Sequence, residues 1–304
     1  MKLLSFFFFS FFLFSFFTTI SFSQDIGETP AKKSKGAKGF HAGLFVGSYY
    51  ANKYTSKLYD GWGYDVDGKR NDFTNSFMNR RINYDFGGGY GQIDQVALAL
   101  GVNHGEWSFD ETDMPTKMKY TSTFIYGVQM NYGFTKKDAL VININAAKIN
   151  AGGNFTITVL NPLIGPQQPG YKDLRTFSIT GSEQRLIMQT GYRRILGENE
   201  ILNFFVEAGP SFNFTKYIRN QITINNLPID MAFYYTQQYY PTYRASYLRG
   251  TGWGAFGSIG LNLTANPKWT LQFLYNPSFE KINIGEEPKI TLQNSFGLRA
   301  FYNL

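Results

Sequence analysis

The chain has 304 residues, of which 18% are aromatic and only 17% are charged, and its formal net charge is +7. It contains no cysteine, which excludes disulfide scaffolds, thiol chemistry and cysteine-ligated zinc. The two histidines, His41 and His104, leave little room for a histidine metal site or for most histidine-containing catalytic triads. A chain that is rich in aromatic residues and yet polar on average must place the two classes on separate faces.

Residues 1–23 have the features of a cleaved signal peptide. Lys2 supplies the positive charge, residues 6–17 are almost entirely apolar, and Ser21-Phe22-Ser23 offers the small residues that a signal peptidase recognises. An uncleaved anchor is the alternative, because residues 5–23 nearly reach spanning length. No later stretch approaches the roughly 18 apolar residues of a membrane-spanning helix.

The next segment, residues 24–39, carries several lysines and few apolar residues. Such a composition is typical of a solvated tail, and we expect a basic tail in the periplasm. Contact with anionic lipid or glycan phosphates is the alternative. Binding to nucleic acid is not expected of an exported chain.

From Phe40 onward, apolar and polar residues alternate, which indicates β-strands. In residues 120–134 the apolar positions are mostly aromatic, while the intervening residues are mainly Gly, Thr, Gln and Asn. A soluble sandwich would instead carry Lys, Glu and Thr on its outer face. An aromatic face opposite a face of small polar residues predicts an antiparallel transmembrane β-barrel with lipid outside and a packed polar interior.

Turn signals divide residues 40–304 into strands of this outer-membrane barrel. Short links at 135–138, 197–200 and 265–268 alternate with longer polar links, as the periplasmic turns and external loops of such barrels do. Ten strands are predicted, and the even number places both ends in the periplasm. Arg80 and Arg81 cannot both face inward in the second strand; if that strand fails, the count is eight. The predicted strands are 40–51, 75–86, 92–108, 117–134, 138–158, 177–195, 200–221, 246–264, 268–284 and 289–304.

The two ends of the chain resemble those of outer-membrane β-barrel proteins from Bacteroidetes-like bacteria. The resemblance rests on the leader ending Ser21-Phe22-Ser23-Gln24 and on the last strand, residues 295–304. That strand is similar to the C-terminal signal read by the barrel-assembly machinery, although it ends in Leu304 rather than Phe or Trp. The resemblance implies the cell outer membrane as location, with outer-membrane lipid and the assembly machinery as partners.

Two glycine- and aspartate-rich motifs favour structural roles. Residues 252–257 match the spelling G-x-G-x-x-G, but the alternation continues after them and no helix follows, so nucleotide binding is not expected. Asp65 and Asp67 precede Gly68 and suggest a calcium loop, yet the further bidentate carboxylate is missing. An ordinary Asp-Gly turn in the first external loop is the better interpretation.

His104 and the acidic group Asp110, Glu111 and Asp113 could lie together at the outer rim of the barrel. Outer-membrane proteases place an Asp-His pair and paired carboxylates there, but a second acidic pair is lacking. We therefore expect a rim histidine and a solvated acidic loop tip. No catalytic residue, metal site or cofactor is predicted.

The longest external loop is crowded with aromatic side chains. Such surfaces bind sugars or partner proteins, although an interfacial aromatic girdle is the alternative. The candidate recognition residues are Phe233, Tyr234, Tyr235, Tyr239, Tyr240, Tyr243 and Tyr247.

The alternation also places charged side chains in the lumen, among Gln189, Gln272 and Gln293. A narrow interior requires such charges to be paired, so we expect an Arg/Glu network that blocks ion flow. The predicted network consists of Arg185, Arg193, Glu207, Glu280 and Arg299.

These features predict a non-enzymatic outer-membrane protein with a largely plugged lumen. It would act as a structural or accessory component or bind a partner, which would be an outer-membrane protein complex or a surface glycan. A small-solute channel is the first alternative, and a soluble exported β-sandwich that binds a ligand is the second.

Overall fold

The computed structural model describes residues 39–64, 69–84, 91–160, 172–199, 201–231, 249–266, 268–284 and 289–303. All of them belong to one compact unit, Ala37–Leu304. The predicted signal peptide, the basic tail before residue 39 and the aromatic loop residues 233–247 lie outside the described residues. Within these ranges, no helix has the length and apolar content that a membrane crossing requires.

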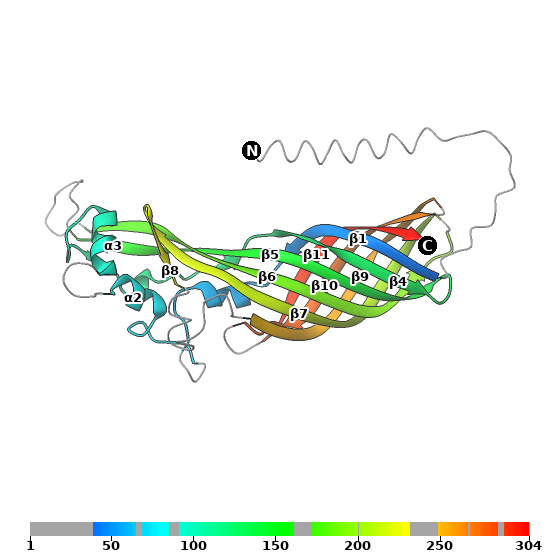
Figure 1. Cartoon of the computed structure of the whole chain (residues 1–304), viewed down its shortest axis with the longest axis horizontal. Helices are drawn as coiled ribbons and strands as arrows, with labels where there is room; N and C mark the ends of the chain where they lie inside the picture. Colours follow the sequence, from blue (N-terminus) through cyan, green and yellow to red (C-terminus); the bar gives the residue numbers. More distant parts are fainter. Residues whose placement is uncertain are drawn as a thin grey trace, which may run out of the picture. The chain divides into compact units, whose positions relative to one another are not determined.

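The described strands close into an antiparallel ring of eight, which confirms the predicted barrel (Figure 1). The first strand, β1, pairs with β4 on one side and with the last strand, β11, on the other. A pairing of β5 with β6 completes the ring. The strands are β1 (Gly39–Tyr50), β4 (Thr123–Gly133), β5 (Asp138–Val159), β6 (Asp173–Leu196), β7 (Leu202–Ile224), β9 (Arg249–Asn266), β10 (Trp269–Lys281) and β11 (Ile290–Asn303).

Two of the ten predicted strands, 75–86 and 92–108, are wrong. They contain the helices α2 (Phe77–Ile82) and α3 (Gln92–Leu100) and the short strand β2 (Trp107–Ser108). The buried residues of α3, Val96, Ala97 and Leu100, recur at helical spacing rather than in alternation. Gly101 then ends the helix with a φ of 74°, a left-handed conformation that favours glycine. The strand count is therefore eight, the alternative drawn from the sequence.

The barrel has a polar interior and an apolar exterior. Inward-facing Gln129, Asn143, Gln272 and Gln293 are buried. The outward faces of the barrel strands expose a belt of large apolar side chains, such as Phe204 on β7. Contact of this belt with water would be strongly unfavourable, whereas contact with lipid is not. The belt includes Leu44, Phe124, Tyr126, Val128, Leu140, Leu186, Phe204, Phe212, Trp253, Ile259, Phe273 and Phe296.

Three strands continue far beyond the barrel. β5, β6 and β7 have 22, 24 and 23 residues, whereas about 9 to 11 suffice to cross a membrane. The inward face of β5 is polar at Asn143 and Asn145 but apolar at Phe155 and Ile157, so its polarity reverses along the strand. The lumen therefore gives way to an apolar core that lies outside the membrane.

An outward-facing polar row marks the edge of the apolar belt. Lys148 pairs in register with Gln184, Gln184 with Lys216, and Lys216 with Arg249. All four residues are exposed. Basic side chains at this height are expected beside the lipid head groups.

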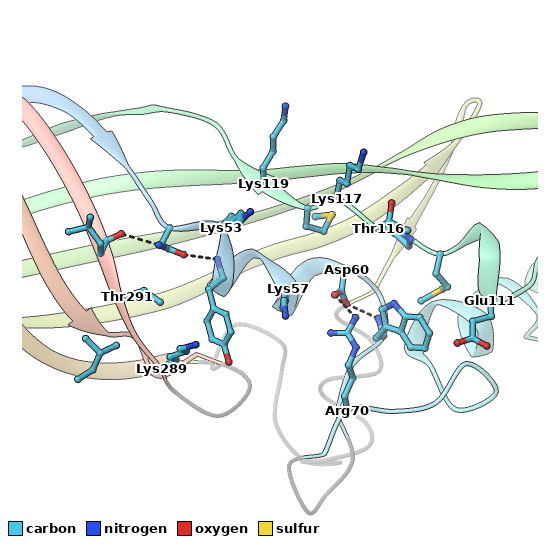
Figure 2. A pocket seen from close by; sticks show the side chains of 18 residues that line it. Lys53, Lys57, Asp60, Arg70, Glu111, Thr116, Lys117, Lys119, Lys289 and Thr291 are labelled. Atoms are coloured by element: carbon cyan, nitrogen blue, oxygen red, sulfur yellow. Dashed lines mark hydrogen bonds and ion pairs between the residues drawn. The ribbon is translucent and has the colours of Figure 1, made fainter.

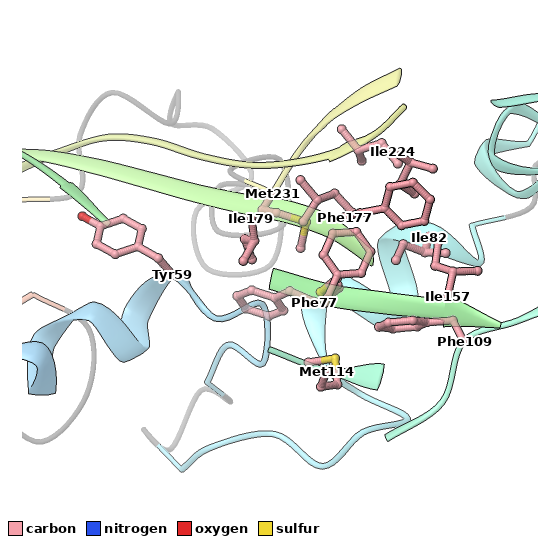
Figure 3. Close-up of a cluster of buried hydrophobic side chains, with 14 of the residues drawn as sticks. Tyr59, Phe77, Ile82, Phe109, Met114, Ile157, Phe177, Ile179, Ile224 and Met231 are labelled. Carbon is pink, nitrogen blue, oxygen red and sulfur yellow. The ribbon is translucent and has the colours of Figure 1, made fainter. Parts of the chain in front are cut away.

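We call the part beyond this row the head: residues 53–120, 149–159, 173–183 and 217–231, where described. Besides α2, α3 and β2 it contains η1 (Lys53–Tyr59), η2 (Glu111–Asp113), β3 (Lys119–Tyr120) and β8 (Leu227–Asp230). Its helices and loops pack on the extended strands through one apolar cluster (Figure 3). This cluster includes Tyr59, Phe77, Ile82, Phe109, Met114, Ile157, Phe177, Ile179, Ile224 and Met231.

The two ends of the barrel differ in the lengths of their connections. The predicted short links join β4 to β5, β6 to β7 and β9 to β10. The first residue of β1 and the last residue of β11 lie at the same end of the barrel. The head and the longer connections lie at the opposite end. Gly252–Gly257 lies inside β9 and is followed by strand β10, as expected from the continued alternation.

Candidate functional site

The lumen contains a buried ion cluster on the short-turn side. Arg299 Nη1 donates to both carboxylate oxygens of Glu207, at 2.7 and 2.9 Å. Arg193, which faces Glu207 across the β6–β7 pair, places Nη1 4.0 Å from the same carboxylate. All three side chains are buried. One carboxylate thus compensates two guanidinium groups in the interior of the barrel.

A second buried ion pair lies in the lumen at the head side. Arg185 Nε donates to Glu183 Oε1 at 2.6 Å, and neither side chain has any solvent exposure. Arg185 also donates to the Tyr49 hydroxyl at 3.1 Å and to Gln293 Oε1 at 3.3 Å, which links three strands. A further bond at 3.0 Å to Thr55 Oγ1 connects this cluster to η1.

The 3₁₀ helix η1 lies over the lumen and is held there by its own side chains. The hydroxyl of Tyr59 donates to Glu183 Oε2 at 2.7 Å, and that of Tyr120 donates to the same atom at 3.0 Å. Burial and the neighbouring Glu183 raise the pKa of the Tyr59 phenol well above its usual value, so the phenol remains a donor at neutral pH. A Cβ at Gly181 would collide with the Tyr59 ring, and glycine is needed there for this close approach.

Glu280 is not paired with an arginine, which corrects the expected arrangement of the network. Its carboxylate is fully buried and accepts from Ser211 Oγ at 2.7 Å and Asn213 Nδ2 at 3.2 Å. Within the described ranges, no cationic group lies within 4.0 Å of it. Neutral hydrogen-bond donors therefore stabilise the Glu280 carboxylate, for which the sequence predicted an arginine partner.

Amide side chains fill the space between the two ion clusters. Gln189 Oε1 accepts from Asn276 Nδ2 at 3.1 Å, and Gln272 donates to Asn262 at 2.8 Å. Gln129 donates to Asn145 at 2.9 Å. An eight-stranded barrel is just wide enough for side chains to fill, and here buried polar side chains do so.

A cavity of about 1040 Å³ lies beside η1 where the barrel meets the head (Figure 2). Its walls come from three stretches far apart in the sequence: η1 with the loop after it, residues 114–119, and the first residues of β11. Five lysines line it: Lys53, Lys57, Lys117, Lys119 and Lys289. We call this cavity the basic pocket.

Hydrogen bonds fix the wall of the basic pocket to the barrel. The backbone N–H of Asn52 donates to Gln293 Oε1 at 2.8 Å, and its Nδ2 donates to the carbonyl of Leu292 at 3.2 Å. Asn52 Oδ1 accepts from the N–H of Tyr54 at 2.9 Å and thereby caps η1. Buried η1 side chains therefore contact the ion pair in the lumen, while Lys53, Tyr54 and Lys57 line the pocket.

Among the described lining residues, the two carboxylates Asp60 and Glu111 compensate only part of the positive charge of the basic pocket. Asp60 Oδ2 already accepts from Arg70 at 2.7 Å. Among the described residues, none of the five lysines has a carboxylate within 4.0 Å. Lys57 Nζ and Lys289 Nζ instead lie 5.3 and 5.7 Å from the centre of the Tyr54 ring. The arrangement is suited to holding an anion.

The remaining motifs have structural positions. His104 is exposed and contacts Asp94 at 3.0 Å rather than Asp110 or Asp113. Asp110 and Glu111 are exposed, and Asp110 caps η2, whereas Asp113 is buried and accepts from Thr156, so only Asp113 departs from the expected solvated loop tip. In the described part of the chain, no three His, Cys, Asp or Glu side chains converge as a metal site would require. Residues 65–68 lie outside the described residues.

Sequence reasoning missed the basic pocket. Its lysines are single residues in separate loops, without a shared motif, and only the fold brings them together. It also missed Glu183, although Glu183 and Arg185 have the same parity in one alternating strand and must face the same side. This shared parity was sufficient to predict that the side chains of Glu183 and Arg185 lie together.

No family model matches the chain, and no curated protein matches it significantly. Several solved outer-membrane proteins are similar at low identity. Neisserial surface protein A is 8% identical with a TM-score of 0.41, over 89% of this chain and 100% of that chain. OprG from Pseudomonas aeruginosa is 10% identical with a TM-score of 0.39, over 88% and 98%. Ail of Yersinia pestis is 8% identical with a TM-score of 0.33, over 87% and 98%.

The class of this protein follows from its own barrel. A closed antiparallel ring with an apolar belt outside and polar side chains inside is stable only in a membrane, and single-chain barrels of this kind belong to the outer membrane. The chain is an outer-membrane β-barrel protein.

Proposed function

We propose that this protein is a non-enzymatic surface protein, in which a sealed barrel anchors a head that binds a partner or ligand outside the cell. The observation that carries the proposal is the continuation of β5, β6 and β7 into a head with its own apolar core. A barrel that served only as an anchor or a pore would not need this core. The short turns at the opposite end support placing that end in the periplasm and the head outside.

The sealed lumen supports this role over that of a small-solute channel. The Arg185–Glu183 pair and η1 close the head side, and the Glu207 cluster fills the short-turn side. We expect negligible conductance when the native protein is inserted into a planar bilayer, with a sixteen-stranded porin as the positive control. Large, steady single-channel currents from the native protein would favour the channel instead.

The orientation can be tested by labelling, because the chain has no natural cysteine. Leu98 on α3 in the head is 82% exposed, and Lys136 lies exposed in the short turn between β4 and β5. In a Gram-negative host, Leu98→Cys should react with an impermeant maleimide on intact cells. Lys136→Cys should react only after the outer membrane is permeabilised. The opposite pattern would place the head in the periplasm and refute a surface role.

The ends of the chain and the aromatic loop complete the proposal. Export would use cleavage after residue 23, residues 24–39 would remain as a periplasmic tail, and the assembly machinery would read residues 295–304. A Bacteroidetes-type origin is supported by the leader and the last strand alone. Residues 233–247 follow β8 in the chain, so they would add a second recognition surface to the head.

A further inference from the structure

We propose that the basic pocket binds a polyanionic saccharide, meaning a short chain of sugar rings that carries several phosphate or sulfate groups. The inference deepens the proposed surface function and rests on it, because the pocket lies where the barrel meets the head. Three properties of the pocket support it: its charge, its rigidity and its size.

The charge of the pocket requires an anion with more than one negative group. Lys53 and Lys57 come from η1, Lys117 and Lys119 from the segment before β4, and Lys289 from the start of β11. Lining one cavity with five lysines from three segments concentrates positive charge there, and like charges repel one another. A ligand with several negative groups removes this repulsion, whereas a single small anion neutralises only part of it.

The pocket is organised before any ligand binds. Asn52 ties the beginning of η1 to β11, and Tyr59 and Thr55 tie its buried face to the ion pair in the lumen. The Tyr54 ring holds the ammonium groups of Lys57 and Lys289 near its centre. Because these groups are already positioned, binding loses little side-chain entropy.

The size and lining of the pocket indicate the scaffold of the ligand. About 1040 Å³ is far more than one phosphate or sulfate occupies and corresponds to a ligand of drug size or larger. The charged side chains among its lining residues call for polar or charged groups on the ligand. A chain of sugar rings is hydrophilic, carries several phosphates or sulfates at once, and occurs outside cells. Such a chain therefore fits the charge and the size of the pocket and the location of the head.

The test uses the full chain in detergent micelles, with sucrose octasulfate as the free probe and sucrose and inorganic sulfate as controls. Calorimetry at low salt should show saturable binding of the octasulfate, no binding of sucrose, and much weaker binding of sulfate. Lys57→Ala/Lys289→Ala should weaken octasulfate binding about tenfold or more, because charge-assisted contacts are lost. The matched control Lys148→Ala/Lys172→Ala removes the same charge from exposed positions outside the pocket and should change the affinity less than about twofold.

Tyr54 provides a second, sharper comparison. Tyr54→Ala should lower octasulfate affinity severalfold because Lys57 and Lys289 lose the ring that positions them, whereas Tyr54→Phe keeps the ring and should retain the affinity. No binding by the native protein, or equal losses in the pocket and control double variants, would overturn the proposal.

A parallel arm identifies the source of the saccharide. Nanodiscs containing a phosphorylated glucosamine-disaccharide glycolipid are compared with nanodiscs containing phosphatidylglycerol. Specific protection of Lys57 and Lys289 from amine labelling by the glycolipid indicates a membrane head group, whereas binding of the octasulfate without such protection indicates a free saccharide. Binding in micelles depends neither on orientation nor on conductance, so failure of this inference is distinguishable from failure of the proposed function.

Discussion

Glu183→Gln is expected to destabilise the folded protein by about 3 to 5 kcal/mol, because it leaves the buried guanidinium of Arg185 without a counter-charge. The glutamine still accepts a hydrogen bond from Tyr59, so the loss reflects charge rather than volume. Equilibrium unfolding in urea, followed by tryptophan fluorescence in micelles, measures the change.

Two comparisons isolate the buried pair. The double variant Glu183→Gln/Arg185→Met removes both charges and should recover most of the stability. Glu198→Gln breaks an exposed contact with Lys137 and should leave the unfolding midpoint unchanged. If Glu183→Gln and Glu198→Gln unfolded at the same urea concentration, the pair would not hold the barrel mouth together.

Glu207→Ala should cost about 3 kcal/mol or more, because Glu207 alone faces both Arg193 and Arg299. Its removal leaves two buried guanidinium groups with no carboxylate within 4.0 Å among the described residues. The same urea titration measures this loss, and the unheated protein should also lose its folded mobility on a detergent gel at a lower temperature.

Ser258 supplies the control on the same rung of the barrel. Ser258 lies on β9 and pairs in register with Glu207 on β7. It is buried, and its hydroxyl has no hydrogen-bond partner among the described residues. Ser258→Ala should therefore have little effect on stability. A native-like midpoint for Glu207→Ala would show that the arginines are solvated rather than paired, which would contradict a sealed lumen.

The barrel was predictable because its signal is local. Alternation in one strand assigns every side chain to the lumen or to the lipid without knowledge of the neighbouring strands. For this reason eight strands, to within a few residues except at the start of β4, and the inward positions of Arg193, Glu207 and Arg299 could be read from the chain. The short turn between β6 and β7 placed Glu207 within one or two rungs of Arg193, and the structure pairs the two residues in register.

The head was harder to predict from the sequence, although one local pattern indicated it. Along β5, Asn143 and Asn145 share their parity with Phe155 and Ile157, so the polar face becomes the apolar face. Such a reversal marks the point where lipid gives way to water. Residues 75–108 were assigned to strands because the general alternation was extended over them, whereas Val96, Ala97 and Leu100 follow a helical period.

The sequence by itself determined the class of protein, the strand count as one of two alternatives and the polarity of the lumen, since each depends on residues close together in the chain. Only the tertiary structure decided that η1 contacts the ion pair in the lumen, that Glu280 is satisfied by Ser211 and Asn213, and that five lysines line one pocket. Some of these features join residues that lie more than two hundred positions apart in the chain. Their proximity follows from ring closure and from packing of the head on β5, β6 and β7, which no local pattern records.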